Sequence, residues 1–543
     1  MIDTTFTRTP ELPRLADYPA HWARTTPDGE AVVDGARSMT YAEFEQQIDT
    51  AARSMLALGV KRGDRVAMLA TPCQAHLVHY LAAARLGAIW LGLNPRYQLN
   101  ELRHVLGDAR PSMVVAMLEI EGRTYCDEFA TLRAEVLADL PLVALHGSAP
   151  GFMSWDDFMT SGTGMDSATL KAAAAAVSAD DAALIVYTSG STGAPKGALL
   201  SHRAIVTSAR IQCEHWWGDP FRLLNFAPIN HIGGAIQLTC HAIVAGGTNV
   251  LMPRFDPIAM RAVLKEERIT VLHLVPTMYQ LLLEKGLPSR EDMASLQAMI
   301  WSGAAAPRSL IEQLRRYCPH LFTSYGLTET GAEVLYTAAG ASDETLALSV
   351  GKPVPQIPLR LGLLDGSGEA AEPSGEIQVQ GPTVMSGYFG NPQATTAAFT
   401  ADGWLRTGDI GEHRNDGSYR ITGRIREMYK SGGYNIYPRE VELVLERHPG
   451  VAIAAVVGVP DPVYGEIGHA WILAGTSPVD AAELEAFCRE HLANYKIPKR
   501  IHVHSELPML PIHKVDKAVL CRWSVQGHPF PPELGSATMK ETP

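Results

Sequence analysis

The chain has 543 residues, more than one hydrophobic core usually organises, so at least two domains are expected. Hydrophobic residues make up 46% and charged residues 19%, the composition of an ordinary soluble globular protein. The net charge is −12 and no long run of Lys and Arg occurs, which argues against a nucleic-acid partner, because a phosphate backbone binds to a basic face.

Cysteine usage and hydrophobicity indicate where the protein works. The seven cysteines are scattered, without a C-x-x-C pair or the Cys/His spacing of a metal site, which predicts reduced thiols and a cytoplasmic location. Residues 1–5 do not start a basic and then apolar region, so no signal peptide is expected. No stretch approaches the roughly 18 uncharged residues of a transmembrane helix, so no membrane span is expected.

The first hundred residues alternate between strand and helix patterns. Strand patterns occupy 30–33, 63–69 (after a turn) and 89–93, and helix patterns begin at Thr40, a good N-cap residue, and near Cys73. Strands that alternate with helices in this way predict a parallel sheet with helices on its faces.

Residues 187–197 are rich in glycine and hydroxyl groups and follow a short buried-type strand at 184–186. Backbone N–H groups in such a segment can turn inward around an anion, while the hydroxyls and Lys196 add donors and charge. The segment is not a Walker A loop, because Pro195 and Gly197 stand where that motif needs Gly and Ser/Thr. A flexible linker is the alternative, but the strand directly upstream favours a phosphate loop.

Three later segments combine polar groups with turns. His231 lies between apolar residues, where a packed core histidine is the alternative to a binding role. A strand at 299–301 leads into the small-residue turn 302–307. Thr328 can donate to a phosphate and Glu329 suits Mg²⁺, which prefers oxygen ligands; a surface turn is the alternative there.

After a hairpin turn at 416–419 the composition changes to that of a compact α+β domain. This part contains the pair Gly432-Gly433 and ends in the segment 507–517. Two lysines in that last segment, Lys514 and Lys517, compete for a catalytic role.

In their order and text, these segments resemble the signatures of the adenylate-forming (AMP-binding) superfamily, in its acyl-CoA synthetase or fatty-acid–CoA ligase branch. The resemblance covers about Ala31 to about Leu520. It implies an α/β fold with a large N-terminal domain of αβ layered sheets and a small mobile α+β C-terminal domain. The implied domains are 1–425, for AMP and acyl-substrate binding, and 427–543, with a hinge at Arg426, where the family usually has Asp or Lys.

The resemblance also implies roles for individual residues. Catalysis falls to Lys514, Glu329 and Thr328, and Mg²⁺ binding to Thr188 and Glu329. The acid would be lined by His231, Ile232, Gly233, Gly331 and Ala332. The nucleotide and CoA would be bound by Thr188, Ser189, Gly190, Ser191, Thr192, Gly193, Lys196, Ser302, Gly303, Ala304, Tyr325, Gly326, Thr328, Asp409, Arg424 and Lys514, with Gly432 and Gly433 lining the pantetheine tunnel. Lys517 has the wrong offset for the catalytic lysine, and His513 replaces the usual Gly beside Lys514.

The implied activity is that of an AMP-forming acyl-CoA synthetase, which uses ATP, Mg²⁺, a carboxylic acid and coenzyme A. The carboxylate attacks the α-phosphate of ATP to give acyl-AMP and pyrophosphate, and the CoA thiol then gives acyl-CoA and AMP. The small pocket residues predict a medium- or long-chain fatty acid or a bulky aryl or alicyclic acid. Trp301 would favour short acids if it entered the pocket, although strand alternation turns it away from the side of Ser302. A homodimer is left open.

Other functions remain as alternatives. A carrier-directed amino-acid adenylating domain would usually have an Asp near His231 and a downstream L-G-x-x-S, and both are missing from the sequence. A luciferase-like oxidase shares every nucleotide motif. A non-enzymatic nucleotide sensor is disfavoured because Lys514 and Glu329 are intact. Hydrolases find no support, because no G-x-S-x-G or H-E-x-x-H motif occurs.

Overall fold

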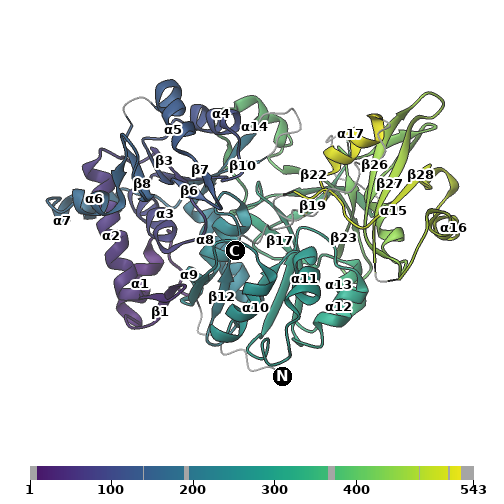
Figure 1. The fold of residues 1–543 in the computed structure, drawn as a ribbon, viewed down its shortest axis with the longest axis horizontal. Coiled ribbons are helices and arrows are strands. Elements are labelled where there is room, and N and C mark those ends of the chain that lie inside the picture. The colour runs from purple at the N-terminus through teal and green to yellow at the C-terminus, as the bar shows by residue number, and fades with distance from the viewer. Residues whose placement is uncertain are drawn as a thin grey trace, which may run out of the picture.

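The protein consists of a large N-terminal part and a smaller C-terminal part, drawn in yellow-green at one end of the molecule in Figure 1. Sheets of nine, eight and four strands build the first part, and a five-stranded sheet builds the second. The predicted α/β fold with a large N-terminal and a small C-terminal domain is confirmed. The computed structural model describes residues 9–137, 140–188, 195–364, 373–475, 477–510 and 514–526.

The eight-stranded sheet has a parallel centre, and its strands are buried and apolar because helices pack on it. In spatial order its strands are β21 (Gly387–Tyr388), β11 (Lys196–Ser201), β10 (Ala182–Thr188), β4 (Ile89–Leu93), β3 (Arg65–Leu69), β5 (Met113–Met117), β8 (Leu142–His146) and β9 (Met153–Ser154). The helices of this region are α1 (Asp17–Thr25), α2 (Tyr41–Ala57), α3 (Gln74–Leu86), α4 (Leu99–Ala109), α5 (Cys126–Leu132), α6 (Trp155–Ser161) and α7 (Ser167–Ala175).

The nine-stranded sheet is also parallel at its centre, from β1 to β16, and antiparallel at both edges. Its strands are, in order, β18 (Lys352–Pro353), β17 (Ala332–Tyr336), β16 (Leu321–Leu327), β15 (Ala298–Ser302), β14 (Val271–Leu274), β12 (Arg222–Asn225), β13 (Thr248–Leu251), β1 (Glu30–Asp34) and β2 (Arg37–Thr40). Its helical segments are α8 (His202–His215), η2 (Gly233–Leu238), α9 (Thr239–Ala245), α10 (Pro257–Glu266), α11 (Pro276–Leu281), α12 (Arg308–Leu314) and α13 (Asp343–Leu348).

A short two-stranded sheet pairs β6 (Glu119–Ile120) with β7 (Arg123–Thr124), and two larger sheets follow each other later in the chain. The antiparallel four-stranded sheet consists of β19 (Leu359–Gly362), β20 (Ser374–Val379), β22 (Leu405–His413) and β23 (Tyr419–Arg424), with α14 (Pro392–Ala398) inserted before β22. The C-terminal sheet consists of β25 (Tyr434–Ile436), β24 (Tyr429–Ser431), β27 (Gly465–Ala474) and β26 (Val451–Asp461), with β28 (Arg500–His504) beside β27 and helices α15 (Pro438–Leu445), α16 (Ala481–His491) and α17 (Lys517–Gln526).

Local side-chain chemistry explains where these elements begin. The hydroxyl of Thr40 accepts a hydrogen bond from the N–H of Glu43, and the Glu43 carboxylate accepts one from the N–H of Thr40, a reciprocal cap that starts α2. In β15, Trp301 is fully buried in the hydrophobic core of the sheet, on the side opposite to Ser302, as strand alternation predicts. Among the described helices, none has both the length and the apolar character to cross a bilayer.

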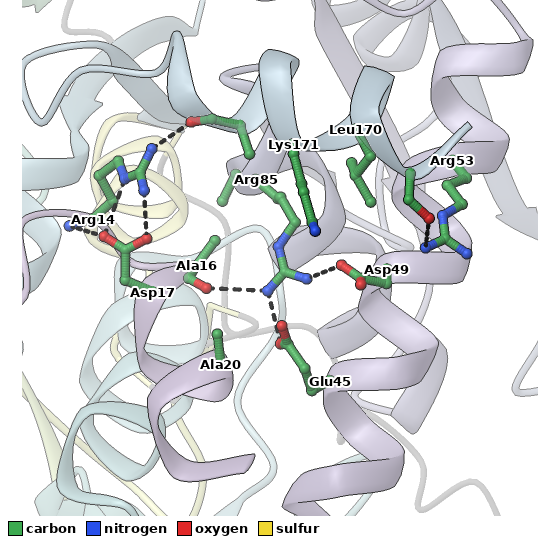
Figure 2. Close-up of a pocket in the computed structure, with 13 residues that line it drawn as sticks. Arg14, Ala16, Asp17, Ala20, Glu45, Asp49, Arg53, Arg85, Leu170 and Lys171 are labelled. Carbon is green, nitrogen blue, oxygen red and sulfur yellow. Dashed lines mark hydrogen bonds and ion pairs between the residues drawn. The ribbon is translucent and has the colours of Figure 1, made fainter. Parts of the chain in front are cut away.

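Charged side chains line a pocket where α1, α2, α3 and α7 meet (Figure 2). Arg85 of α3 is buried there and forms ion pairs with Glu45, at 2.7 Å, and with Asp49, both on α2. The guanidinium also donates to the carbonyl of Ala16, just before α1. The charge of Arg85 is therefore paired within the protein, and the pocket serves the packing of these helices.

A buried ion-pair cluster fastens the last helix to the C-terminal sheet. Lys517, at the start of α17, pairs with Glu442 on α15 at 2.8 Å and with Glu427 in the turn after β23. Glu442 is buried and also accepts hydrogen bonds from Arg439 and from the N–H of Val456. The two cations hold the pKa of Glu442 below its usual value despite its burial. Lys517 is therefore a structural residue.

Replacement of Lys517 should destabilise the C-terminal part. In Lys517→Met, Glu442 keeps only Arg439 as a cationic partner. We expect the free energy of unfolding to fall by about 2 kcal/mol, less than the roughly 3–5 kcal/mol of a fully unpaired buried charge. Chemical unfolding measures this loss. Lys499→Met, at an exposed lysine of the same part, is the control and should change stability by less than about 0.5 kcal/mol. Equal stability of the two variants would contradict the structural role of Lys517.

Candidate functional site

The predicted site residues gather where strands of three sheets end. Ser302 closes β15 and the Thr328–Glu329 turn follows β16, at the carboxyl edge of the parallel part of the nine-stranded sheet, which is where ligands bind in such sheets. Asp409 lies on β22, and Arg424 ends β23. The topology therefore brings residues from distant parts of the chain to one edge.

Lys514 reaches this edge from the C-terminal part. Gly303 has a φ of +80°, and a Cβ atom there would lie 3.0 Å from both Cε and Nζ of Lys514, so the ammonium lies directly against the backbone of Gly303. Burial first, and then the nearby Arg424, lower the pKa of Lys514 to about 8, although Asp409 and Glu427 oppose this shift. Unlike Lys517, Lys514 forms no ion pair with a described residue. A half-buried cation that forms no ion pair with a described residue fits an anionic ligand.

Asp409 is a buried carboxylate with two protein partners. Its Oδ2 accepts a hydrogen bond from the hydroxyl of Tyr325 at 2.7 Å, and its Oδ1 pairs with Nε of Arg424 at 2.8 Å. Burial raises the pKa of Asp409, which Arg424 partly offsets. A carboxylate has about four lone-pair positions, so both oxygens can still accept hydrogen bonds from a ligand.

Glu329 is linked to the strand that follows the glycine-rich segment. The hydroxyl of Tyr388, on β21, donates to Oε1 of Glu329 at 2.9 Å. Burial and the neighbouring Glu329 raise the pKa of Tyr388, so this hydroxyl stays protonated. The Nζ of Lys196 lies 5.5 Å from the centre of the Tyr388 ring. Tyr388 thus holds one oxygen of Glu329 in place and leaves Oε2 for a metal ion or a ligand.

The glycine-rich segment is described only at its two ends. Thr188 ends β10 and pairs with Lys196, which begins β11, so these two residues close a hairpin. Ser189, Gly190, Ser191, Thr192 and Gly193 lie outside the described residues, as does His513. Within the described part of the chain, no group of three or more His, Cys, Asp or Glu side chains could hold a metal ion by itself. Glu329 therefore fits a Mg²⁺ ion that takes its other ligands from phosphate oxygens, water and a hydroxyl such as that of Thr188.

The residues predicted for the acid come from two neighbouring segments. His231 precedes η2, and its Nδ1 accepts a hydrogen bond from the N–H of Gly233 at 3.0 Å. Burial lowers the pKa of His231 to about 4, and Lys514 adds to the shift, so the ring is neutral and its proton is on Nε2. Gly331 and Ala332 follow the Thr328–Glu329 turn, both with positive φ, and a Cβ at Gly331 would lie 2.2 Å from the carbonyl oxygen of Thr383. Glycine is thus required at 331 by close backbone packing.

Sequence reasoning missed a polar group next to these residues. Glu333, on β17, is fully buried and accepts hydrogen bonds from Gln212 and Gln237. The available signal was a carboxylate inside an apolar strand, since residues 332–336 read Ala-Glu-Val-Leu-Tyr. Tyr388 was also missed, because its partner Glu329 is 59 residues away in the chain.

The predicted hinge residue and the glycine pair predicted to line the pantetheine tunnel both lie after β23. Arg426 is exposed in the turn that joins β23 to β24 and thus the two parts of the protein. Gly432 and Gly433 form the turn between β24 and β25, with φ values of 57° and 87°. A Cβ at Gly433 would meet no atom within 4 Å, so this turn is open and does not join the group around Lys514.

Family comparisons match nearly the whole chain. The family described as AMP-binding enzyme matches residues 19–389, and the AMP-binding enzyme C-terminal domain matches residues 440–514. The chain is 34% identical to a feruloyl-CoA synthase of an Amycolatopsis species, covering 94% of this chain and 98% of that protein. It is 35% identical to a 3-[(3aS,4S,7aS)-7a-methyl-1,5-dioxo-octahydro-1H-inden-4-yl]propanoyl:CoA ligase of Mycobacterium tuberculosis, with coverages of 92% and 96%.

Solved structures agree with these matches. ATP-bound MatB from Rhodopseudomonas palustris superposes with a TM-score of 0.79 at 29% identity, covering 93% of this chain and 98% of that one. The o-succinylbenzoate CoA synthetase MenE from Bacillus subtilis, in complex with its acyl-adenylate intermediate, gives a TM-score of 0.76 at 29% identity, with coverages of 93% and 97%.

Proposed function

The chain belongs to the AMP-binding enzyme family and is an ATP-dependent, AMP-forming acid–CoA ligase, and we propose that its acid is a bulky aryl or alicyclic carboxylic acid and that the residues around Lys514 perform the chemistry. The observation that carries the assignment of the site is the position of Lys514, half-buried against Gly303 without an ion-pair partner among the described residues.

In the first half-reaction a carboxylate attacks the α-phosphate of ATP and pyrophosphate leaves. Both reactants are anions, so positive charge at the point of attack lowers the barrier. Lys514 provides this charge, and the Nε2–H of neutral His231 can donate a hydrogen bond to the attacking carboxylate. His231 is held by the N–H of Gly233 and Lys514 lies against Gly303, so the two anions would meet in a prepared position and the step becomes local.

The nucleotide would be fixed by groups on three sheets. Asp409, held by Tyr325 and Arg424, accepts hydrogen bonds from the ribose hydroxyls. The exposed backbone of Gly303 and Ala304 provides a surface for the adenine, next to Ser302. Thr328 donates to the α-phosphate, and the segment between Thr188 and Lys196 surrounds the outer phosphates.

When bound, Mg²⁺ neutralises phosphate charge. Glu329 would hold the ion through the oxygen that Tyr388 leaves free, and Thr188 would add a hydroxyl ligand. Tyr388 thereby orients the carboxylate before the metal arrives, since its own pKa is raised and it remains a donor.

The second half-reaction needs a different arrangement, because Lys514 occupies the site that the thiol of CoA must approach. We propose that residues 427–543 rotate about Arg426 against residues 1–425, which removes Lys514 and brings the open Gly432–Gly433 turn to the site. CoA then attacks the acyl carbon, and AMP leaves. All seven cysteines are free thiols, which supports a cytoplasmic location. A homodimer remains part of the proposal, to be decided by the mass of the protein in solution.

Loss of Lys514 should separate the two half-reactions. Lys514→Ala removes the charge used in adenylation, and we expect ATP–pyrophosphate exchange to fall about 10²–10³-fold. Transfer from supplied acyl-AMP to CoA should stay within about threefold of the unchanged enzyme, because Lys514 is absent from that arrangement. Lys61→Ala, at an exposed lysine of the N-terminal part, is the control. Equal loss of both half-reactions would refute the rotation.

Neutralising Glu329 should raise the Mg²⁺ requirement. In Glu329→Gln a neutral amide replaces the carboxylate, and the amide is a poorer ligand for a hard cation. We expect the Mg²⁺ concentration for half-maximal adenylation to rise about tenfold, equivalent to about 1.4 kcal/mol of metal binding. Glu344→Gln, at an exposed glutamate on α13, serves as the control. An unchanged Mg²⁺ dependence would show that another group holds the metal.

The size of the acid should determine the rate. Each buried methylene contributes about 0.8 kcal/mol, so kcat/KM should climb from acetate through butyrate and octanoate to 3-phenylpropanoate and a polycyclic propanoic acid. CoA-dependent AMP release across this series measures the trend and tests the ligase function itself. Trp301, packed in the core, leaves room for these acids. A preference for acetate over octanoate would disprove a large acid pocket.

A further inference from the structure

Two polar side chains, Gln237 and Glu333, lie next to the residues assigned to the acid. Resting on the ligase function above, we propose that Gln237, oriented by Glu333, recognises a hydroxyl group on the ring of the acid. The two residues thereby select a hydroxylated aryl or alicyclic acid over its unsubstituted counterpart.

Glu333 is a buried carboxylate supported by amides alone. Its Oε2 accepts a hydrogen bond from Nε2 of Gln212 at 2.7 Å, and its Oε1 accepts one from Nε2 of Gln237. It forms no ion pair with a cation of the described residues, whereas the buried Glu376 pairs with Arg406 and the buried Glu442 with Lys517. Burial raises the pKa of Glu333 to about 7, which the two amides only partly offset. A buried carboxylate without a cation is costly, which makes a purely structural role a poor explanation.

The carboxylate fixes which way the two glutamines point. An ionised carboxylate only accepts hydrogen bonds, so both glutamines must turn their NH₂ groups toward Glu333 and their carbonyl oxygens away from it. The Oε1 of Gln212 is buried and has no hydrogen-bond donor among the described residues. Within the described part of the chain, the amide oxygens that point away from Glu333 therefore receive no hydrogen bond.

Gln237 faces the residues assigned to the acid. It lies one turn after Gly233 on η2, and its Oε1 would be 3.0 Å from a Cβ at Gly233, close to Nδ1 of His231, at 3.1 Å from the same point. Gln237 is partly accessible, although the residues before and after it are buried. On the other wall, Glu333 directly follows Ala332 and is paired with Gly326 on β16. The amide oxygen of Gln237 thus lies beside Gly233 and His231, two of the residues assigned to the acid.

A hydroxyl group is the donor that fits this arrangement. It would donate to the carbonyl oxygen of Gln237 and satisfy an acceptor that an unsubstituted ring leaves unpaired. A site built to hydrogen-bond a substrate hydroxyl discriminates strongly against the analogue without it. The oxygen of a methyl ether or a ketone cannot donate a hydrogen bond and would face the carbonyl oxygen of Gln237, which is also an acceptor. These groups would be favoured only if Glu333 were protonated and the glutamines turned around.

The first test uses the unchanged enzyme. AMP release is measured with 3-phenylpropanoate, its 3-hydroxyphenyl and 4-hydroxyphenyl forms, the 4-methoxyphenyl ether, and the cyclohexane analogues with a 4-hydroxyl or a 4-ketone. We expect at least one hydroxylated acid to exceed its unsubstituted partner about 100-fold in kcat/KM, and the ether and ketone to show no such gain. Equal rates for hydroxylated and unsubstituted acids, or a preference for the ether or ketone, would overturn the proposal while leaving the ligase function intact. Failure of every acid to release AMP would refute the ligase function and the proposal together.

The second test follows the ratio between a hydroxylated acid and its unsubstituted partner in variants. Gln237→Met removes the acceptor at similar size, and Glu333→Gln replaces the group that orients it. In both variants we expect the ratio to fall from about 100 to below about 5, because the discrimination comes from one oriented acceptor. A structural defect alone would slow both acids equally and leave the ratio unchanged, and that result would refute the proposal.

The matched control is Gln297→Met. Gln297 is also partly buried and bonds to the backbone of Asp219 at the opposite edge of the nine-stranded sheet, just before β15. The same chemical change there should leave the ratio at its original value. A fall of the ratio in the control as large as in Gln237→Met would show that the selectivity does not come from Gln237, and the proposal would fail.

Discussion

The position of one ammonium group, that of Lys514, governs the arrangement of the whole molecule. It lies half-buried at the junction of the two parts, against the backbone of Gly303, and forms no ion pair with a described residue. Desolvation and the nearby Arg424 lower its pKa, so a negatively charged ligand would stabilise the protonated form. The parallel strands that end at Ser302 and Leu327, and the hairpin that carries Asp409 and Arg424, lie around this point. The sheets thus serve to collect these groups, and the C-terminal part serves to deliver the lysine.

Much of this arrangement could be predicted from the chain, because the signals are local. Thr40 and Glu43 form the cap that their spacing indicates, and the alternation of Trp301 and Ser302 places one in the core and the other at the edge of the sheet. The preference for Lys514 over Lys517 as the catalytic lysine stays a prediction, with which the structure agrees in that Lys517 pairs with Glu442 while Lys514 lies against Gly303. Each of these inferences needed only neighbouring residues or a spacing within one motif.

The residues that escaped prediction act through partners distant in sequence. Tyr388 matters because β21 pairs with β11 and lies beside the turn that carries Glu329. Glu333 matters because α8 and η2 bring two glutamines to one strand, 121 and 96 residues away. A pattern of apolar and polar residues shows that Glu333 is unusual in its strand, but it does not reveal what surrounds it. The packing of these elements shows that Gln212 and Gln237 donate to Glu333, which the sequence pattern alone could not reveal.

The clamp at Lys517 has a mechanical consequence for the turn at Arg426. Glu427 is the next residue along, and Lys517 ties it to α15, so the chain becomes part of a stiff body immediately after Arg426. On the other side, Arg424 is bound to Asp409 in the four-stranded sheet. In the rotation proposed above, the change in backbone torsion would thereby be confined to the few bonds around Arg426. Rotation about so few bonds would favour a small number of relative orientations of the two parts over a continuous range. Spectroscopic labels placed on the two parts would then report a few separate interlabel distances instead of one broad distribution.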